Sequence, residues 1–250
     1  MIELCAGDLR SVVEFMGDLA TLETAHPFDE IVLSRLRELI PAVDASYVEI
    51  DRRRHQVVDG RDSTWVEGGF SDELYFTYAH QCPQRVHRDR TGDPSALRVG
   101  DLTNERQWHE LGLYRECFLP LHIDHPLEIA LSAPVGRERT IALWHEGGGR
   151  DFSDRERAIL ELVRPHLGQR LELAELRRRV TVEAIDGAEL TSREREIVGL
   201  VAGGKTNAEI AAVLWIAPST VKKHLENVYE KLGVPGRAAA VARLQDVRAG

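Results

Sequence analysis

Cysteine is scarce in this sequence, and its few residues are far apart. Cys5, Cys82 and Cys117 are odd in number and show no C-x-x-C spacing, which argues against a disulfide framework or a cysteine zinc site. Reduced thiols in the cytoplasm are therefore expected. No apolar run approaches the roughly 18 residues that a membrane-spanning helix needs, and no basic stretch precedes an apolar run near Glu3. We accordingly expect neither a transmembrane segment nor a secretory signal.

Side-chain arrangements that would carry catalysis or hold a metal are also missing. No Ser/His/Asp set and no pair of carboxylates stands at a spacing that indicates nucleophilic or acid–base catalysis. His122, Asp124 and His125 lie close together, but they are expected at a strand edge or turn, and no further ligand completes a metal site. His80 and His87 give no better set. We expect no catalytic site, no bound metal and no cofactor.

Positive charge is in deficit over the whole chain but not at its C-terminal end. The formal net charge is −9, which at first argues against a nucleic-acid partner. Residues 191–250 contain nine basic and six acidic side chains, so this segment carries +3 and the remainder carries −12. The segment can therefore approach DNA, whereas the acidic remainder should stay away from it. So small a positive charge also indicates that one copy binds weakly and that two copies are needed.

What the sequence does contain is a run of short amphipathic helices near that end. Residues 191–202 repeat apolar side chains at helical spacing, and Thr191 with Glu194 forms a capping box at the start. Thr206 and Glu209 form a second capping box, which predicts another short helix with a buried stripe. Two helices joined by a tight turn are therefore expected in this region.

A third helix is predicted after Pro218, with Ser219 as its cap and Gly233 as its end. Its apolar positions recur at helical spacing and should face the core; they are Val221, Leu225, Val228, Tyr229 and Leu232. Two adjacent lysines, Lys222 and Lys223, lie off this stripe and should be exposed. An alanine-rich fourth helix is expected over residues 237–247.

One stretch inside this region matches a motif of a different function. Residues 199–206, GLVAGGKT, fit the pattern G-x-x-x-x-G-K-[ST], whose glycine-rich loop binds phosphates between a strand and a helix. A nucleotide-binding enzyme is thus an alternative hypothesis. However, the helical period of residues 191–202 places Gly199 inside a helix, with no buried strand before the loop. In the other interpretation Gly203 and Gly204 simply stop that helix.

A helix, a short turn and a following helix with exposed basic residues form a helix-turn-helix. The second helix of this motif enters the DNA major groove. The segment strongly resembles the DNA-binding domain of LuxR-type regulators, over roughly a quarter of the chain. Ala217 and Gly236 depart from the family pattern, which often has serine at both places. The matching residues are Leu190, Thr191, Arg193, Glu194, Glu196, Gly204, Asn207, Glu209, Ile210, Ala211, Leu214, Ser219, Thr220, Val221, Lys222, His224, Asn227, Tyr229, Lys231, Leu232, Gly233, Val234 and Arg237.

The resemblance implies roles for residues at the start of the third helix. Lys222, Lys223 and Glu226 would meet base edges, since lysine can donate to guanine and a carboxylate can accept from cytosine. A solvated helix position is the equal alternative for Glu226. Glu194 would pair within the domain, and Trp215 would pack in its core. The other DNA-binding residues, chiefly phosphate contacts at helix starts and nearby lysines, would be Lys205, Thr206, Asn207, Ser219, Thr220 and Lys231.

The first 180 residues alternate helices and strands in an order typical of an α+β domain. Helices are expected at 8–24, 27–40, 71–81, 105–108 and 111–117, and strands at 45–51, 56–59, 98–102, 127–133 and 140–145. The last two strands should form an antiparallel pair that turns at residues 134–137. A long helix is expected to begin at the cap Ser153 and to continue to residue 180.

This first part resembles the GAF domains that accompany LuxR-type DNA-binding domains. The resemblance rests on residues 140–144, 151–157 and 164–167. It implies an α+β fold class, in which a GAF-like antiparallel sheet with flanking helices precedes an all-α four-helix domain. The expected boundaries are 1–180 for a GAF-like sensor and dimerisation domain, 181–188 for a linker and 189–250 for the helix-turn-helix domain.

Aromatic residues crowd the middle of the first domain. Such residues line small-molecule sites but also fill cores, so both interpretations stay open for Trp65, Phe76, Tyr78, Trp108 and Tyr114. The tryptophan, tyrosine and aspartate pattern of acyl-homoserine-lactone sensors cannot be aligned here, which favours a different ligand or none. The leucines of residues 169–179 form one side of a half-charged helix that either dimerises or packs on its own sheet.

These patterns predict a bacterial-type transcription regulator in the cytoplasm. A homodimer would bind a roughly palindromic site on double-stranded DNA, because the twofold symmetry of protein and operator should correspond. The first domain would sense an unidentified small molecule or a protein, and RNA polymerase is a further candidate partner. Two other classes stay open: a nucleotide-binding enzyme built on residues 199–206, and a protein-interaction module that uses the helix-turn-helix surface.

Overall fold

The computed structural model describes residues 4–24, 26–63, 72–187, 190–202 and 205–240. The chain divides into two units, Met1–Leu171 and Glu172–Gly250. Within the described ranges, no helix is both long enough and apolar enough to cross a membrane.

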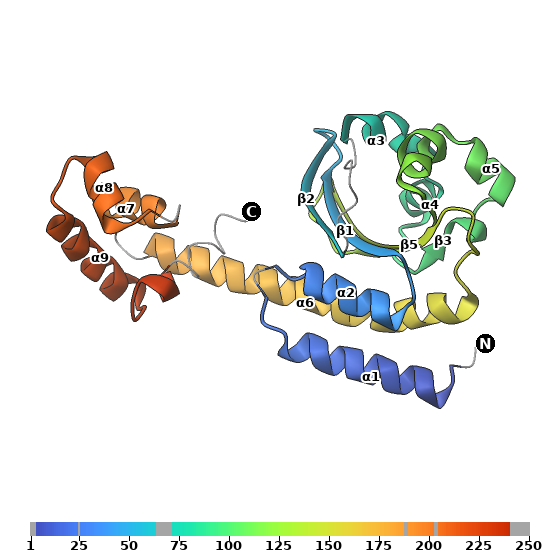
Figure 1. The fold of residues 1–250 in the computed structure, drawn as a ribbon, viewed down its shortest axis with the longest axis horizontal. Coiled ribbons are helices and arrows are strands. Elements are labelled where there is room, and N and C mark those ends of the chain that lie inside the picture. Colours follow the sequence, from blue (N-terminus) through green and yellow to red (C-terminus); the bar gives the residue numbers. More distant parts are fainter. Residues whose placement is uncertain (1–3, 25, 64–71, 188–189, 203–204, 241–250) are drawn as a thin grey trace. The chain divides into compact units, whose positions relative to one another are not determined.

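An antiparallel sheet organises the N-terminal unit (Figure 1). Its strand order in the described residues is β2-β1-β5-β4-β3. β1 pairs with β5 along its whole length, and β5 pairs in turn with β4, so that Ile141 lies between Tyr47 and Ile129. The strands are β1 (Asp44–Asp51), β2 (Gln56–Asp62), β3 (Leu97–Arg98), β4 (Ile123–Leu131) and β5 (Arg137–Glu146).

One face of this sheet is covered by two N-terminal helices and by the first part of a long helix (Figure 1). They are α1 (Ala6–Thr21), α2 (Glu30–Leu39) and α6 (Asp154–Gly187). Alternate strand residues point to the same face, so Tyr47, Ile129 and Ile141 enter one core with Val32 of α2 and Val163 of α6. All five are at most 1% exposed. This core holds the beginning of α6 firmly against the sheet.

Short helices cover the other face of the sheet (Figure 1), and an aromatic cluster packs there. The elements are α3 (Asp72–Tyr78), α4 (Pro83–Thr91) and α5 (Glu105–Glu110), with single turns at Ala79–Gln81, Val99–Asp101, Leu113–Phe118 and Leu119–Leu121. Trp108, Tyr114 and Phe118 pack together there, and Phe118 contacts Trp144 of β5 with ring centroids 4.8 Å apart. Aromatic and aliphatic side chains together therefore form the apolar part of this layer.

The α+β fold class, with flanking helices followed by a helical domain, is confirmed. The predicted pairing of the last two strands is also confirmed, although β4 begins earlier, at Ile123. The predicted strand at 98–102 is wrong in extent. Only Leu97 and Arg98 pair with β4, and Val99–Asp101 turns instead as a 3₁₀ helix. The apolar pattern was too short to distinguish a strand from a buried turn.

Helix α4 is an element that the sequence pattern did not predict. It attaches to the sheet largely through charge rather than through an apolar stripe. Arg85 Nε lies 3.2 Å from Glu138 Oε2, and Arg88 pairs with Glu128. All four side chains are at most 15% exposed. A helix held in this way leaves no periodic hydrophobic signal in its sequence.

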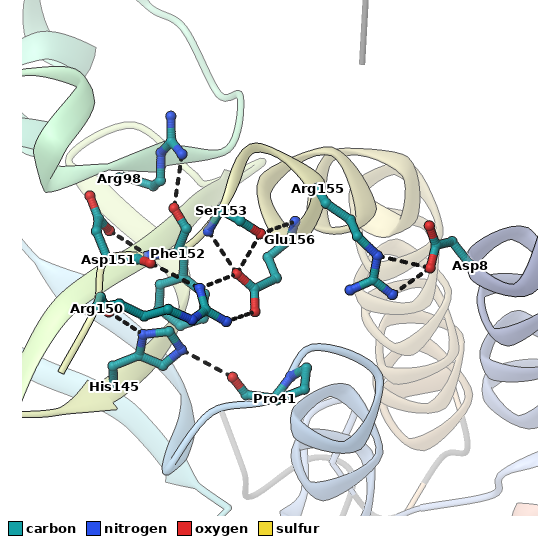
Figure 2. Close-up of polar contacts among 10 residues, drawn as sticks. All are labelled: Asp8, Pro41, Arg98, His145, Arg150, Asp151, Phe152, Ser153, Arg155 and Glu156. Atoms are coloured by element: carbon teal, nitrogen blue, oxygen red, sulfur yellow. Dashed lines mark hydrogen bonds and ion pairs between the residues drawn. The ribbon is translucent and has the colours of Figure 1, made fainter. Parts of the chain in front are cut away.

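A cluster of hydrogen bonds fixes the first turn of α6 (Figure 2). Ser153 caps the helix, as predicted, and also forms a capping box with Glu156. The Ser153 amide donates to Glu156 Oε2 at 2.6 Å, and the Glu156 amide donates to Ser153 Oγ at 3.3 Å. Arg150 donates to both carboxylate oxygens of Glu156, at 2.6 and 2.8 Å. Burial raises the pKa of Glu156, but the hydrogen bonds from Arg150 and Ser153 outweigh it and lower that pKa to about 2.

The same turn ties α6 to three other elements (Figure 2). Arg155 Nε donates to Asp8 Oδ1 of α1 at 2.9 Å. The ring of Phe152 stacks on His145 of β5 with centroids 3.7 Å apart, and His145 Nε2 lies 3.1 Å from the carbonyl oxygen of Pro41. We refer to Arg150, Phe152, Ser153, Arg155 and Glu156 as the α6 anchor. It joins α6 to α1, to β5 and to the end of α2.

Beyond the anchor, α6 runs continuously to Gly187. It therefore passes through residues 181–187, which the sequence analysis assigned to a linker. The predicted boundaries 1–180, 181–188 and 189–250 stay predictions, because a continuous helix does not by itself mark where one domain ends.

The C-terminal unit contains α7 (Ser192–Ala202), α8 (Asn207–Leu214) and α9 (Pro218–Leu232). Ile197 and Val201 of α7 meet Ile210 of α8 and Val221 of α9 in one small core. Both predicted capping boxes are present: the Thr191 amide donates to Glu194 at 2.8 Å, and the Thr206 amide donates to Glu209 at 2.7 Å. The predicted fourth helix is seen as one turn at residues 237–240, and its remainder lies outside the described residues.

Candidate nucleic-acid interface

Helix α9 separates an apolar face from a charged one. Val221, Leu225, Val228 and Leu232 are at most 4% exposed, as the sequence spacing predicted. The intervening positions that carry charge lie outward: Lys222, Lys223 and Glu226 are exposed. A helix of this kind is held by its domain on one side and leaves its other side available to a partner.

The start of α9 differs from the prediction. Ala217, rather than Ser219, is the N-cap residue, and Pro218 occupies the first helical position. Proline suits that position because the missing N–H would have no partner inside the helix. Ser219 and Thr220 therefore stand within the first turn, exposed and beside Lys222. This correction frees the Ser219 hydroxyl from a capping role.

Lys222 and Glu226 of α9 form a weak ion pair on the exposed face of the helix. Lys222 Nζ lies 3.8 Å from Glu226 Oε1, one turn along the helix, and both side chains are more than 60% exposed. An exposed pair of this spacing contributes only a few tenths of a kcal/mol. Either side chain can therefore leave the other for a base or a phosphate at little cost.

The start of α8 is a second surface of interest. The Thr206 hydroxyl caps the helix and hydrogen-bonds with Glu209. Arg237 donates to the side-chain oxygen of Asn207 at 3.1 Å and to the backbone oxygen of Lys205. The structure thus brings Lys205, Thr206 and Asn207 together, with an arginine beside them. A helix N-terminus flanked by two cations is suited to a phosphate group.

Lys231 lies in a different setting from the other candidate residues. Its ammonium group donates to Glu194 Oε2 at 2.7 Å, and the Glu194 side chain is only 4% exposed. The hydrogen bond from Lys231 is the main cause that lowers the pKa of Glu194. Glu194 does pair within the domain, as its family position implied. The contact joins the beginning of α7 to the end of α9.

Replacing Lys231 with alanine is therefore expected to destabilise the C-terminal unit, because it leaves a buried carboxylate without its cation. We expect a loss of about 1–3 kcal/mol. Thermal unfolding of the full-length protein measures it, and Lys231→Ala combined with Glu194→Gln should recover part of the loss. A variant as stable as wild type that binds every DNA sequence more weakly would instead identify Lys231 as a phosphate contact.

Trp215 is placed differently from the expectation that it packs in the domain core. It is 93% exposed and lies in the turn between α8 and α9. Its φ of 54° is in the left-handed region, where it ends α8 with its amide donating to the Ala211 carbonyl oxygen. The local geometry of the helix end, rather than the apolar character of tryptophan, decides this position.

The described part of the glycine-lysine motif lacks the strand that precedes a nucleotide-binding loop. Gly199 lies inside α7, where an added Cβ would meet nothing within 4 Å. A helix therefore precedes the candidate loop, in the place where the nucleotide-binding motif requires a strand. Gly203 and Gly204, which were expected to stop this helix, lie outside the described residues. The amide of Lys205 donates to the Leu200 carbonyl oxygen, which closes the end of α7.

Most of the aromatic residues proposed for a pocket belong to one packed cluster of the N-terminal unit. Trp108 is 1% exposed and Tyr114 is 7% exposed, and Tyr78 packs against them. Phe76 lies to one side, stacked on His55 at 5.7 Å. Trp65 lies outside the described residues. A small-molecule site here stays a prediction.

Asp124 is the polar centre of this aromatic cluster, and sequence reasoning assigned it no such role. Its side chain is fully buried and accepts hydrogen bonds from Trp108 Nε1 at 2.7 Å and from the His125 amide at 2.7 Å. His109 Nε2 lies 2.8 Å from its other oxygen. Burial raises the pKa of Asp124, but these bonds outweigh it and leave that pKa below its usual value. Apolar residues near Asp124 in the sequence were a sign that its side chain could be buried.

Comparison with known proteins identifies the C-terminal segment. Residues 188–244 match the family model described as bacterial regulatory proteins, luxR family. A probable transcriptional regulatory protein NarL of Mycobacterium tuberculosis is 57% identical over 53 residues, which is 21% of this chain and 24% of that protein. A probable transcriptional regulatory protein SgaR of Hyphomicrobium methylovorum is also 57% identical over 53 residues, covering 21% and 25%. The chain thus spans about a quarter of the length of these relatives.

Solved structures resemble the chain only weakly. Escherichia coli SdiA gives a TM-score of 0.42 at 17% identity and covers 96% of this chain and 98% of its own. The GAF domain of a phosphoenolpyruvate-protein phosphotransferase from Coxiella burnetii gives 0.42 at 12% identity, covering 68% and 95%. Scores of this size support no functional comparison.

Proposed function

We propose, from the premise that residues 188–244 form a LuxR-family DNA-binding domain, that this protein regulates transcription by binding specific sites on double-stranded DNA. The observation that carries the proposal is the two-faced helix α9. Its apolar face is buried at Val221 and Leu225, while Lys222 and Lys223 are exposed in its first two turns. Recognition helices of helix-turn-helix proteins present their N-terminal residues to base edges in this way.

In this proposal the candidate residues divide between bases and phosphates. Lys222, Lys223 and Glu226 read base edges, and the starts of α8 and α9 hold the flanking phosphates. Lysine donates to guanine acceptors, and a backbone phosphate is neutralised by a lysine or a helix N-terminus. The phosphate-binding set comprises Lys205, Thr206, Asn207, Ser219 and Thr220. Lys231 is not included in this set, because in the unbound domain it pairs with Glu194.

We further propose that two copies bind a roughly palindromic site. The +3 charge of residues 191–250 is small for a single domain on DNA, and the rest of the chain is acidic. Leu162, Leu173 and Leu176 of α6 are 42%, 47% and 57% exposed, which provides apolar surface along a long helix. If the α6 helices of two copies pack symmetrically, the resulting dimer has twofold symmetry, which matches a palindromic DNA site.

The N-terminal unit is proposed to be the sensor that controls this binding in the cytoplasm. The aromatic cluster of Trp108, Tyr114 and Tyr78, with Phe76 to one side, is the candidate place for a small effector. Trp65, the fifth candidate, lies outside the described residues. Aromatic side chains with a few polar groups line many small-molecule sites, and Asp124 provides a polar group within this cluster. The α6 anchor would couple that unit to α6, and RNA polymerase is the further partner through which such a regulator would act.

The proposal is tested by measuring the affinity of the full-length protein for a short labelled DNA duplex over a series of salt concentrations. We expect affinity to fall steeply and linearly on a logarithmic salt scale, because lysine–phosphate contacts release counterions. Sedimentation of the complex should give two protein chains for each specific duplex. Absence of binding to any duplex at low salt would overturn the proposed function and favour a protein-interaction module.

A further inference from the structure

The turn between α8 and α9 carries an exposed surface without charged side chains. From Ile210 to Val221 the sequence contains no charged residue, although 29% of the whole chain is charged. Seven positions in this stretch are exposed: Ala212, Val213, Trp215, Ala217, Pro218, Ser219 and Thr220. We call these seven residues the turn surface. A stretch that is exposed but uncharged is suited to close contact with a partner, since little charge must lose its water.

Trp215 dominates the turn surface. At 93% exposure its indole makes almost no contact within the protein. Its left-handed backbone is a conformation that glycine or asparagine adopts more easily. Neither packing nor backbone geometry therefore accounts for a tryptophan at this place. A role in contact with a partner does account for it, because tryptophan combines a broad apolar face with one N–H donor.

The position of the turn favours DNA as that partner. Pro218, the first residue of α9, is three residues from Trp215, a separation of at most about 10 Å along the chain. In a helix-turn-helix the helix before the recognition helix crosses the sugar–phosphate backbone. Trp215 ends that helix, and the turn surface continues directly into the exposed first turn of α9.

We propose that Trp215 contacts the sugar–phosphate backbone at the edge of the major groove, a proposal that rests on the DNA-binding function above. Its ring packs on deoxyribose, and its Nε1–H donates to a phosphate oxygen. Such a contact adds affinity for every sequence, since sugars and phosphates are the same along the duplex. It adds nothing to the salt dependence, because a neutral side chain releases no counterion.

The matched variants are Trp215→Asn and Val135→Asn in the full-length protein. Asparagine tolerates the left-handed backbone, so the first removes the indole without straining the turn. Val135 is also 93% exposed but lies between β4 and β5 of the N-terminal unit, so the second is a control for loss of an exposed apolar residue. Thermal unfolding should be unchanged in both.

Binding of each protein to one short duplex is measured at several salt concentrations. For Trp215→Asn we expect roughly tenfold weaker affinity, typical of losing one aromatic contact to nucleic acid, with the same salt slope as wild type and Val135→Asn. Addition of duplex should change the tryptophan emission of wild type more than that of Trp215→Asn.

Equal affinities for wild type and Trp215→Asn would overturn the assignment and leave the turn surface to a protein partner. A reduced salt slope in Trp215→Asn would also contradict it, since the loss would then lie in displaced lysines. Failure of the wild-type protein itself to bind any duplex is a different result, which removes the proposed function rather than the role of Trp215 alone.

Discussion

Replacing both Lys222 and Lys223 with alanine is expected to reduce affinity for a specific DNA site by about 100-fold or more. Each lysine that contacts a base or phosphate contributes on the order of 1–3 kcal/mol. Both are exposed on α9, and the only carboxylate paired with Lys222 among the described residues is the exposed Glu226 at 3.8 Å. Their removal therefore breaks no strong contact inside the domain, and stability should change little.

The matched control is Arg53→Ala with Arg54→Ala. These adjacent, exposed residues lie in the turn between β1 and β2, so the control removes the same charge from the N-terminal unit. Gel-shift titrations at two salt concentrations should show a large loss for the lysine variant and almost none for the arginine variant. Lys223→Ala alone should relax the preference among base pairs at one position of each half-site. Equal losses in both double variants would show that only overall charge matters.

Replacing Glu156 with glutamine is expected to destabilise the N-terminal unit by about 1–3 kcal/mol. Glu156 is 2% exposed and holds Arg150 and the Ser153 cap in the α6 anchor. Glutamine keeps the shape of the side chain but loses its charge and at least one acceptor, so the hydrogen bonds from Arg150 and Ser153 to this buried group are weakened or lost. Glu14→Gln, an exposed position in α1, is the control and should have little effect. Chemical unfolding of the full-length proteins gives the comparison.

The pH dependence of unfolding tests the same anchor independently. The pKa of Glu156 is about 2 in the folded protein, well below its usual 4.5. A carboxyl with a lowered folded-state pKa stabilises the protein fully above its unfolded pKa, and that contribution is lost as pH falls toward 2. Allowing for solvent screening, about 2 kcal/mol should disappear over this range. The Glu156→Gln variant should lack this part of the acid sensitivity; an unchanged profile would contradict the role of the carboxylate.

The C-terminal unit could be predicted well because its signals are local. Capping boxes at Thr191 and Thr206 involve residues three apart, and the buried stripe of α9 follows from helical spacing alone. The errors arose where the same residues allow two local solutions. Ser219 is a good cap, yet Pro218 already fits the first helical position and moves the cap to Ala217.

The exposure of Trp215 was predicted wrongly, and helix α4 was not predicted, for a different reason. Sequence reasoning assigns tryptophan to cores, but Trp215 ends a helix in the left-handed conformation and points outward. Helix α4 binds the sheet through Arg85 and Arg88, whose partners Glu138 and Glu128 are 53 and 40 residues away. The aromatic centre at Asp124 likewise depends on contacts between separate elements. Such contacts leave no periodic trace in the sequence.

Helix α9 is proposed to read a DNA sequence as part of a symmetric complex. The most direct measurement is selection of bound duplexes from a random pool by the full-length protein, with the Lys222→Ala, Lys223→Ala protein selected in parallel. We expect wild type to enrich two inverted half-sites whose centres lie about one helical turn of DNA, or a multiple of it, apart, and the variant to enrich none. Enrichment of no sequence by wild type, or of the same sequence by both proteins, would contradict this proposal.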